Sequence, residues 1–425
     1  MKVEEIKNQA EQLLKFGKKK ADYVLINVSK SINEDLEIRS NNIDGFDYSD
    51  SCNYLVNVWK DGKKGVAFSN KFSLDLVSKA LKIAKSSKKL SYFYGLPSKK
   101  KLMYPKNYDK KINDLNEETL VDIGKDLIKN TVEKNIIVSK AGVNKDLSFD
   151  ILLNSEGVNV NEKSTSFSVF VCATGKSGQN VSTSWQSKHE NFYFNYDNLM
   201  INAKKECLDF LKAKKLSHKV KNVILKPEPF TNLLVSTLLV NFNAKNIEKN
   251  QSCLIGKLGE QIFDKSFSLN DDGLLKKGVH SSAVDFQGAV HKNTKLVDNG
   301  VVKSFVYDYN TAKKFDVENT GNASASGINF TNVVLNGKHN KVSDGLIVGS
   351  VIGAHTANPM TTDFSVKAEN CYYLDGGVKV PVKGVMISGR MLDVLSDIVS
   401  VGKKKEQKGG IYTGALVSDK VNVIR

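Results

Sequence analysis

The spacing of apolar residues predicts that an amphipathic helix opens the chain. Ile6, Ala10 and Leu13 recur at intervals of three or four residues, which places them on one face of a helix. Alternating apolar and polar residues then predict strands, and Asp61-Gly62 is a typical two-residue turn between antiparallel strands. Further helices are predicted after Ser73 and at 117–134, 198–212, 227–241 and 391–399, and further strands at 148–154, 158–161 and 166–173.

The second half of the chain is rich in short alternating segments and poor in helical spacing. Glycine, asparagine and β-branched residues are frequent there, which favours a mostly antiparallel assembly of short strands. The predicted strands are 288–295, 301–307, 332–336, 344–351, 365–373 and 378–387. Together the patterns predict an α+β protein with a helix–sheet unit at 1–95, a linker at 96–113, a second α+β unit at 114–219 and a β-rich C-terminal domain at 220–425.

The net charge of +16 raises the question of a nucleic-acid partner, because basic surfaces bind phosphates. Only three of the 62 basic residues are arginines, the residue whose planar fork suits bases and phosphates. The lysines are spread along the chain, apart from short runs at 18–20, 99–101 and 403–405. We therefore expect solvated lysines and no nucleic-acid partner, and a basic nucleic-acid-associated regulator stays open as an alternative.

The remaining composition indicates a cytoplasmic protein without a membrane partner. No apolar run approaches the roughly 20 residues that cross a bilayer, and the first residues lack the continuous hydrophobic region of a signal peptide. The five cysteines never occur with C-x-x-C spacing, which argues against a disulfide framework and against a cysteine zinc site.

Specific residues at irregular positions run from Gly256 to Ala323. They read GKLGEQIFDKSFSLNDD from Gly256, DFQGAVHKNTKLVDNGVVKSFVYDYNTAKKF from Asp285 and TGNAS from Thr320. NPMTTDFS and VPVKGVMISGRMLDVLSDIVSVG follow from Asn358 and Val380. This pattern resembles the TldD/PmbA family, the paired subunits of a zinc-dependent peptidase, and within it the PmbA (TldE) branch.

No complete zinc motif accompanies this resemblance. His189-Glu190 is the one His-Glu pair, and the positions that would complete HExxH or HExxxH hold Tyr193 and Phe194 in a strand-like context. In the TldD branch HExxxH lies on the helix that opens the C-terminal half. The matching segment here, PEPFTNLLVSTLLVNF, contains no histidine, and its polar residues facing a site would be Asn232, Ser236 and Asn241.

The resemblance therefore implies a subunit without its own zinc, bound to a TldD-like partner that carries the zinc and its glutamate base. The pair would form a cytoplasmic peptidase that processes unstructured peptides, with this chain as the non-catalytic member. The family has also been described as a modulator of DNA gyrase, which we interpret as an indirect effect. We expect the substrate cleft to be lined, without catalytic roles, by Gly256, Lys257, Gly259, Glu260, Asp285, Tyr307, Asp308, Thr320, Gly321 and Asn322.

Two further alternatives stay open. One is a homodimeric peptidase whose metal site is assembled from the dispersed residues His280, His291, His355 and Asp285. The other is a scaffold that only stabilises its partner. Zinc in the purified chain would favour the first, and cleft substitutions that leave peptidase activity intact would favour the second.

Overall fold

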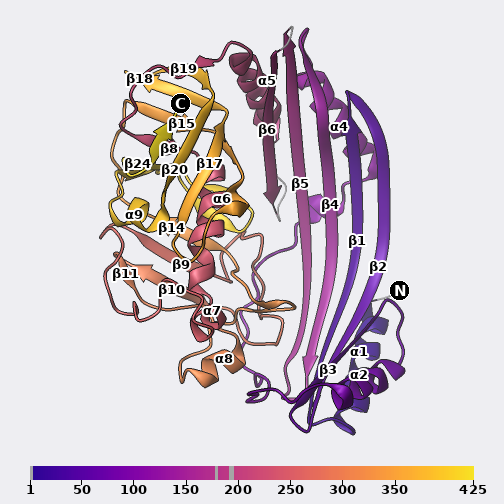
Figure 1. Cartoon of the computed structure of the whole chain (residues 1–425). Helices are drawn as coiled ribbons and strands as arrows, with labels where there is room; N and C mark the ends of the chain where they lie inside the picture. The colour runs from indigo at the N-terminus through magenta and orange to yellow at the C-terminus, as the bar shows by residue number, and fades with distance from the viewer. Residues whose placement is uncertain (1–2, 178–179, 191–195) are drawn as a thin grey trace.

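The computed structural model describes residues 3–177, 180–190 and 196–425, and it consists of two parts that face each other (Figure 1). Residues 3–211 form one long, curved sheet with its helices, which we call the N-terminal layer. Residues 214–425 form several smaller sheets around a helix, which we call the C-terminal part. Helices and largely antiparallel strands occupy separate segments, so the predicted α+β class is confirmed.

The sheet of the N-terminal layer has six antiparallel strands in the order β3-β2-β1-β4-β5-β6. Its hairpins are tight: Ser40-Asn41 joins β1 to β2, and Asp61-Gly62 joins β2 to β3, all four residues having positive φ. This confirms the turn predicted from Asp-Gly, a pair that tolerates left-handed backbone. The strands are β1 Tyr23–Arg39, β2 Asn42–Lys60, β3 Lys63–Ser69, β4 Ile136–Asn154, β5 Asn159–Ser177 and β6 Asn180–Glu190.

The two faces of this sheet have different neighbours. Successive strand residues point to opposite faces. Along β1, Ile26 and Leu36 pack into the cores beneath the helices, whereas Asn27 and Ser29 face the C-terminal part. The helices are α1 Val3–Lys18, α2 Asp75–Ser86, α3 Lys110–Asn113, α4 Glu117–Thr131 and α5 Asp197–Leu211. The sheet therefore uses one face for its own core and offers the other to the rest of the molecule.

Strands β4 and β5 are longer than the sequence pattern predicts. The predicted segment 148–154 is only the end of β4, and 158–161 and 166–173 both belong to β5. Polar side chains fill the middle of these strands and pair across the sheet, as when Asn33 Nδ2 donates to Asp146 Oδ1 at 2.6 Å. Because both faces carry polar residues there, alternation is lost although the backbone ladder continues.

The predicted units at 1–95 and 114–219 each contribute three strands to this one sheet, and β1 pairs with β4 along its length. The segment 96–113 between them is irregular until α3 begins. The division of the chain into units at 1–95 and 114–219, a linker at 96–113 and a domain at 220–425 stays a prediction.

Helix α6, Pro227–Thr237, lies on the side of the C-terminal part that faces the N-terminal layer, and short strands of the C-terminal part pack against its other side (Figure 1). Three larger sheets have the orders β21-β24-β8-β15-β18-β19-β7, β11-β10-β9-β14-β23-β22 and β16-β17-β20-β25, and β12-β13 is a small hairpin. Phe230, Leu233 and Leu234 of α6 are fully buried in the core that these strands share. The predicted helix at 227–241 ends earlier, at Thr237, and a 3-10 turn, η1 Leu239–Phe242, follows it.

Most predicted strands of this part are present, and two are much shorter than predicted. The segment 288–295 begins as a turn because Gly288 has φ +94°, so only its end belongs to β10. The segment 301–307 forms a strand only at Val301–Val302.

The remaining helical elements are α7 Ala244–Glu248, α8 Tyr309–Lys314, η2 Ala354–Thr356 and α9 Met391–Ser396. The remaining strands are β7 Lys214–Lys215, β8 Val223–Leu225, β9 Ser268–Asp272, β10 Asn293–Asp298, β11 Val301–Val302, β12 Ala323–Ser324, β13 Gly327–Ile328, β14 Val333–Asn336, β15 Gly345–Val348, β16 Ser350–Ile352, β17 Asp363–Glu369, β18 Cys371–Asp375, β19 Val378–Lys383, β20 Val385–Arg390, β21 Ser400–Val401, β22 Glu406–Lys408, β23 Ile411–Thr413, β24 Leu416–Ser418 and β25 Asn422–Ile424. Across the described residues, no helix combines the length and apolar character that a membrane span requires.

Candidate functional site

Two adjoining cavities lie between the N-terminal layer and the C-terminal part. The α6 cavity, of about 790 Å³, is bounded by α6, by residues 328–333 and 407–411, and by β5. The sheet cavity, of about 720 Å³, is bounded by the inner face of β1, β2, β4 and β5 and by loops of the C-terminal part. His280, Asn329, Phe330 and Thr331 line both cavities, so we treat the two as one cleft.

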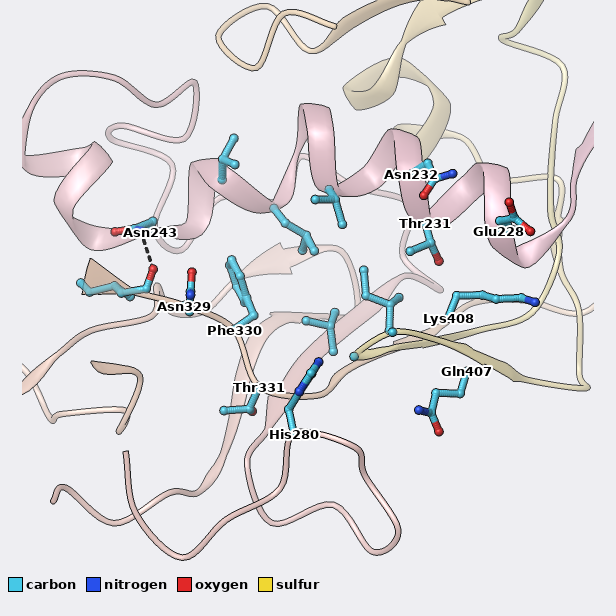
Figure 2. Close-up of a pocket in the computed structure, with 18 of the residues that line it drawn as sticks. Glu228, Thr231, Asn232, Asn243, His280, Asn329, Phe330, Thr331, Gln407 and Lys408 are labelled. Carbon is cyan, nitrogen blue, oxygen red and sulfur yellow. Dashed lines mark hydrogen bonds between the residues drawn. The ribbon is translucent and has the colours of Figure 1, made fainter. Parts of the chain in front are cut away.

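One face of α6 forms a wall of the α6 cavity (Figure 2). Thr231 and Asn232 both lie three or four residues from Glu228 and from Val235, so the four residues share one helix face. Pro227 suits the first turn of the helix because a backbone N–H there has no intrahelical acceptor. The opposite face of α6 is in the core, so the helix is held rigidly and presents a mixed polar and apolar surface to the cleft.

The residues on this face do not fit a zinc ion of the metallopeptidase type. Such a site needs two imidazoles on the helix and a glutamate beside them, and α6 offers a carboxylate, a hydroxyl, an amide and a valine. Of the residues expected to face a site, Asn232 lines the cavity, whereas Asn241 is buried and donates to Thr237 and Pro359 carbonyls. Among the described residues, no three His, Cys, Asp or Glu side chains lie close enough to share a metal.

The alternative metal site from dispersed histidines is not assembled. His280, His291 and Asp285 line the sheet cavity, but His355 lies on η2 and does not. His291 is buried, which lowers its pKa to about 4 despite hydrogen bonds to backbone groups of Gly321 and Val284. His189 lies on strand β6, which confirms its strand-like context, but its side chain is outside the described residues, as are Tyr193 and Phe194.

Asp285 organises the loop beside the sheet cavity. Its Oδ1 accepts hydrogen bonds from the backbone N–H groups of Gln287 and Ala289, both at 2.9 Å. Its Oδ2 accepts from the N–H of Ala323 at 2.9 Å, which ties the loop to β12. Burial raises the pKa of this carboxyl to about 7, although the three hydrogen bonds act in the opposite direction. Both oxygens are thus engaged in shaping the cavity wall.

A second buried carboxylate, Asp271, fixes the segment that the two cavities share. Thr331 donates to Asp271 Oδ1 through its N–H at 2.7 Å and through its hydroxyl at 3.0 Å. Asn322 Nδ2 donates to Asp271 Oδ2 at 2.6 Å and to the Asn329 carbonyl at 2.9 Å. Burial raises the pKa of Asp271 to about 6. This network holds Asn329, Phe330 and Thr331 against the cleft.

Four other predicted residues, Tyr307, Asp308, Thr320 and Gly321, lie near this region without lining either cavity. The N–H of Tyr307 donates to Thr320 Oγ1 at 2.7 Å, and that hydroxyl donates to the Tyr307 carbonyl at 3.0 Å. Gly321 has φ +72°, and a Cβ there would lie 2.6 Å from the carbonyl oxygen of Val290. The backbone of Gly321 therefore lies close to that of Val290, the residue before His291. Asp308 caps α8 and pairs with Lys245 at 2.9 Å.

The GKLGE loop lies apart from the cleft. Gly256 and Gly259 have positive φ and open space where a Cβ would be. Lys257 pairs with Glu260 at 2.9 Å on the surface. Of the ten residues expected to line the cleft, Asp285 and Asn322 line the sheet cavity, and neither cavity is lined by Gly256, Lys257, Gly259, Glu260, Tyr307, Asp308, Thr320 or Gly321.

Several lining residues were not singled out from the sequence. Glu228, Thr231 and Val235 share a face with Asn232, and their helical spacing is the signal that would have found them. No local sequence pattern marks Asp271 and Lys408, because they reach the cleft only through folding. Lys408 then lines the α6 cavity, and Asp271 holds the lining residue Thr331.

Comparison with known proteins identifies chains that are similar along nearly the whole length. Residues 217–425 match the PmbA/TldA metallopeptidase C-terminal domain, and residues 110–220 match the central domain of that family. An uncharacterized protein of Methanocaldococcus jannaschii is 32% identical over 96% of this chain and 98% of its own length. The metalloprotease PmbA homolog of Buchnera aphidicola is 21% identical over 98% of this chain and 96% of its own. The crystal structure of TldE from Thermococcus kodakarensis has a TM-score of 0.92 and 22% identity, covers 98% of this chain and 100% of that one, and shows the shared fold.

Proposed function

The chain belongs to the PmbA/TldD metallopeptidase family, and from this premise we propose that it is a PmbA/TldE-type subunit of a cytoplasmic peptidase pair. In this proposal an unstructured peptide binds in the cleft between the N-terminal layer and the C-terminal part. A TldD-like partner supplies the zinc that activates water for attack on the peptide carbonyl. This chain binds and orients the peptide and does not itself cleave it.

The chemistry of the α6 face carries the proposal. By the sequence resemblance, this helix corresponds to the one that carries HExxxH in the TldD branch, and it lines a cavity large enough for part of a peptide. Its side chains there, Glu228, Thr231, Asn232 and Val235, include no imidazole. A cavity that can hold a peptide but has no zinc ligands suits a subunit that binds the peptide and does not cleave it.

The lining of the cleft suits a peptide of little sequence specificity. Asn232 and Asn329 offer amide groups that can both donate to and accept from a peptide backbone. Val235, Leu239 and Phe330 add apolar surface for side chains. Extended peptides are commonly bound through their backbone groups, with pockets for alternate side chains.

The test compares three preparations: this chain alone, a TldD-like partner alone and their mixture, each with its zinc content measured. We expect cleavage of an unstructured fluorogenic peptide by the mixture, at least about tenfold faster than by either chain alone, with zinc stoichiometric to the partner. Chelator-sensitive cleavage and stoichiometric zinc in this chain alone would overturn the proposal and favour a homodimeric peptidase.

A variant distinguishes a binding subunit from a scaffold. Val235→Trp places an indole in the α6 cavity from a side chain that is 44% exposed, and we expect it to lower cleavage by the mixture about tenfold. Ile83→Trp is the matched control, because Ile83 is 47% exposed on α2, away from the cleft. Equal activity of both variants, with normal assembly, would mean that this chain only stabilises its partner.

A further inference from the structure

A third cavity continues the cleft beyond the start of α6. This lysine cavity, of about 860 Å³, lies between α5, the first turn of α6, β18, β19 and the segment 402–408. Glu228 and Lys408 line both it and the α6 cavity, so the two adjoin. The three cavities therefore follow one another, with the sheet cavity at one end and the lysine cavity at the other.

The charge of the lining changes from one end of this series to the other. Among the described residues, the sheet cavity is lined by the acidic residues Asp150, Glu162 and Asp285 and by no lysine. The described part of the α6 cavity has one lysine, Lys408, and one acidic residue, Glu228. The lysine cavity is lined by six lysines and four acidic residues: Lys205, Lys226, Lys379, Lys403, Lys404, Lys408, Glu206, Asp209, Glu228 and Glu406. The lysine-rich composition of the chain alone does not explain this difference, because it would place lysines around all three cavities in similar numbers.

Most acidic groups of the lysine cavity are already engaged. Glu206 accepts from Lys226 at 2.7 Å, and Asp209 accepts from the hydroxyl of Tyr372 at 3.0 Å. Glu406 lies 3.9 Å from Lys408. In contrast, Lys205, Lys379, Lys403 and Lys404 have no carboxylate within ion-pair distance among the described residues. Four ammonium groups are thus available to a ligand at this end of the cleft.

The start of α6 adds to this positive end. Pro227 lines the lysine cavity, so the N-terminus of an 11-residue helix points there with its partial positive charge. Glu228 lies at the boundary of the two cavities, where burial raises its pKa. A ligand group that satisfies these donors is anionic.

We propose that the lysine cavity binds an acidic stretch at one end of the extended peptide whose middle lies in the α6 cavity. The inference rests on the proposed function, because it names the substrate class of the same cleft. A peptide is favoured over a small free anion because the cavity adjoins the α6 cavity, with which it shares Glu228 and Lys408. The charge of the cleft then sets the direction in which a peptide lies.

Binding of labelled peptides to this chain tests the inference. The peptides are unstructured and about twelve residues long, which spans about 40 Å when extended. They share one neutral sequence and carry three glutamates at the N-terminal end, at the C-terminal end, or nowhere, and a free tri-glutamate serves as a further ligand. We expect one of the two acidic peptides to bind about three- to tenfold more tightly than the neutral peptide, in fluorescence anisotropy at 0.15 M salt. We expect tri-glutamate to bind far more weakly.

Two variants with the same change in charge separate the cavity from the overall charge of the protein. Lys403→Gln combined with Lys404→Gln removes two lysines of the cavity, and we expect it to abolish the preference for the acidic peptide. Lys18→Gln combined with Lys19→Gln removes two exposed lysines at the end of α1 and should keep the preference.

The outcomes separate the inference from the proposed function. Equal binding of acidic and neutral peptides overturns the inference and leaves the proposed function standing. The same follows if the preference survives in the cavity variant, or if tri-glutamate binds as tightly as the full peptide. Failure of every peptide to bind, with or without the partner, overturns the proposed function itself.

Discussion

The N-terminal layer and the C-terminal part reach a stable structure by different means. In the layer, strands of up to 19 residues pair antiparallel, all with a sequence neighbour except for the β1–β4 pair, and helices cover one face with apolar cores. In the C-terminal part, many strands have only two to four residues, and buried side chains such as Asp271, Asp285 and Asn241 hold the loops between them. The long sheet of the N-terminal layer forms a broad wall of the cleft, whereas the loops of the C-terminal part place individual side chains in it. The two should therefore respond differently to substitution.

The largest expected effect is from Asp285→Ala in the C-terminal part. The change leaves the N–H groups of Gln287, Ala289 and Ala323 without their acceptor, and we expect the free energy of unfolding to fall by about 4 kcal/mol. Urea unfolding monitored by fluorescence measures it. Asp47→Ala, at an exposed position of β2, is the control and should change stability by less than about 0.5 kcal/mol. A similar small effect for both would contradict the role given to Asp285.

The N-terminal layer should instead be most sensitive to loss of apolar volume. Leu36 is fully buried in the core under α4, and Leu36→Ala should lower the free energy of unfolding by about 3 kcal/mol because it leaves a cavity. Leu90→Ala, at a position that is 37% exposed, should cost much less. If the two substitutions cost the same, the layer would not depend on its core as described.

The contact between the two regions should make stability depend on pH through Glu162. Glu162 Oε1 accepts a hydrogen bond from the N–H of Ala283 and so joins the N-terminal layer to the C-terminal part. Burial raises the pKa of Glu162 to about 7 from an ordinary value near 4.5. The folded state therefore holds this proton more tightly than the unfolded state does. Its contribution is fully present below about pH 4.5 and is lost as the pH rises through about 7.

Glu162→Gln keeps an acceptor for Ala283 and removes the titration. Between pH 5 and pH 8 the wild type should lose more stability than this variant, by at most about 3 kcal/mol and less where water screens the group. Unfolding curves at the two pH values give the difference directly. His291, whose pKa is lowered to about 4, acts in the opposite direction in both proteins and cancels in the comparison. If stability changes with pH equally in the two proteins, Glu162 is not the group that causes the change.

The smallest expected effect is in the GKLGE loop. Lys257 and Glu260 form an exposed ion pair that lines neither cavity, so Lys257→Ala should change the free energy of unfolding by less than about 0.5 kcal/mol. Peptide binding should also be unchanged within about twofold. A large loss of peptide binding would mean that this loop contacts the peptide, as the sequence resemblance implies.

Prediction from sequence succeeded where the signal is local. The helices at α1, α4, α5 and α6 follow from apolar spacing of three and four residues, and the Asp61-Gly62 turn follows from backbone preference. Prediction failed on strand length in β4 and β5, where polar side chains occupy both faces. Of the ten residues expected to line a substrate cleft, Asp285 and Asn322 line the two adjoining cavities and the other eight do not, and the binding of substrate there stays a proposal.

The sequence by itself determined the α+β class, the family and the absence of histidine on the helix that would carry the zinc motif. These are properties of residues close together in the chain. Only the tertiary structure decided which residues form the cleft, because Ser168, Glu228, His280 and Lys408 are widely separated in sequence. It also decided the change of charge along the cleft. Lysines are spread through the sequence, and their concentration at one end exists only once α5, α6 and β22 pack together.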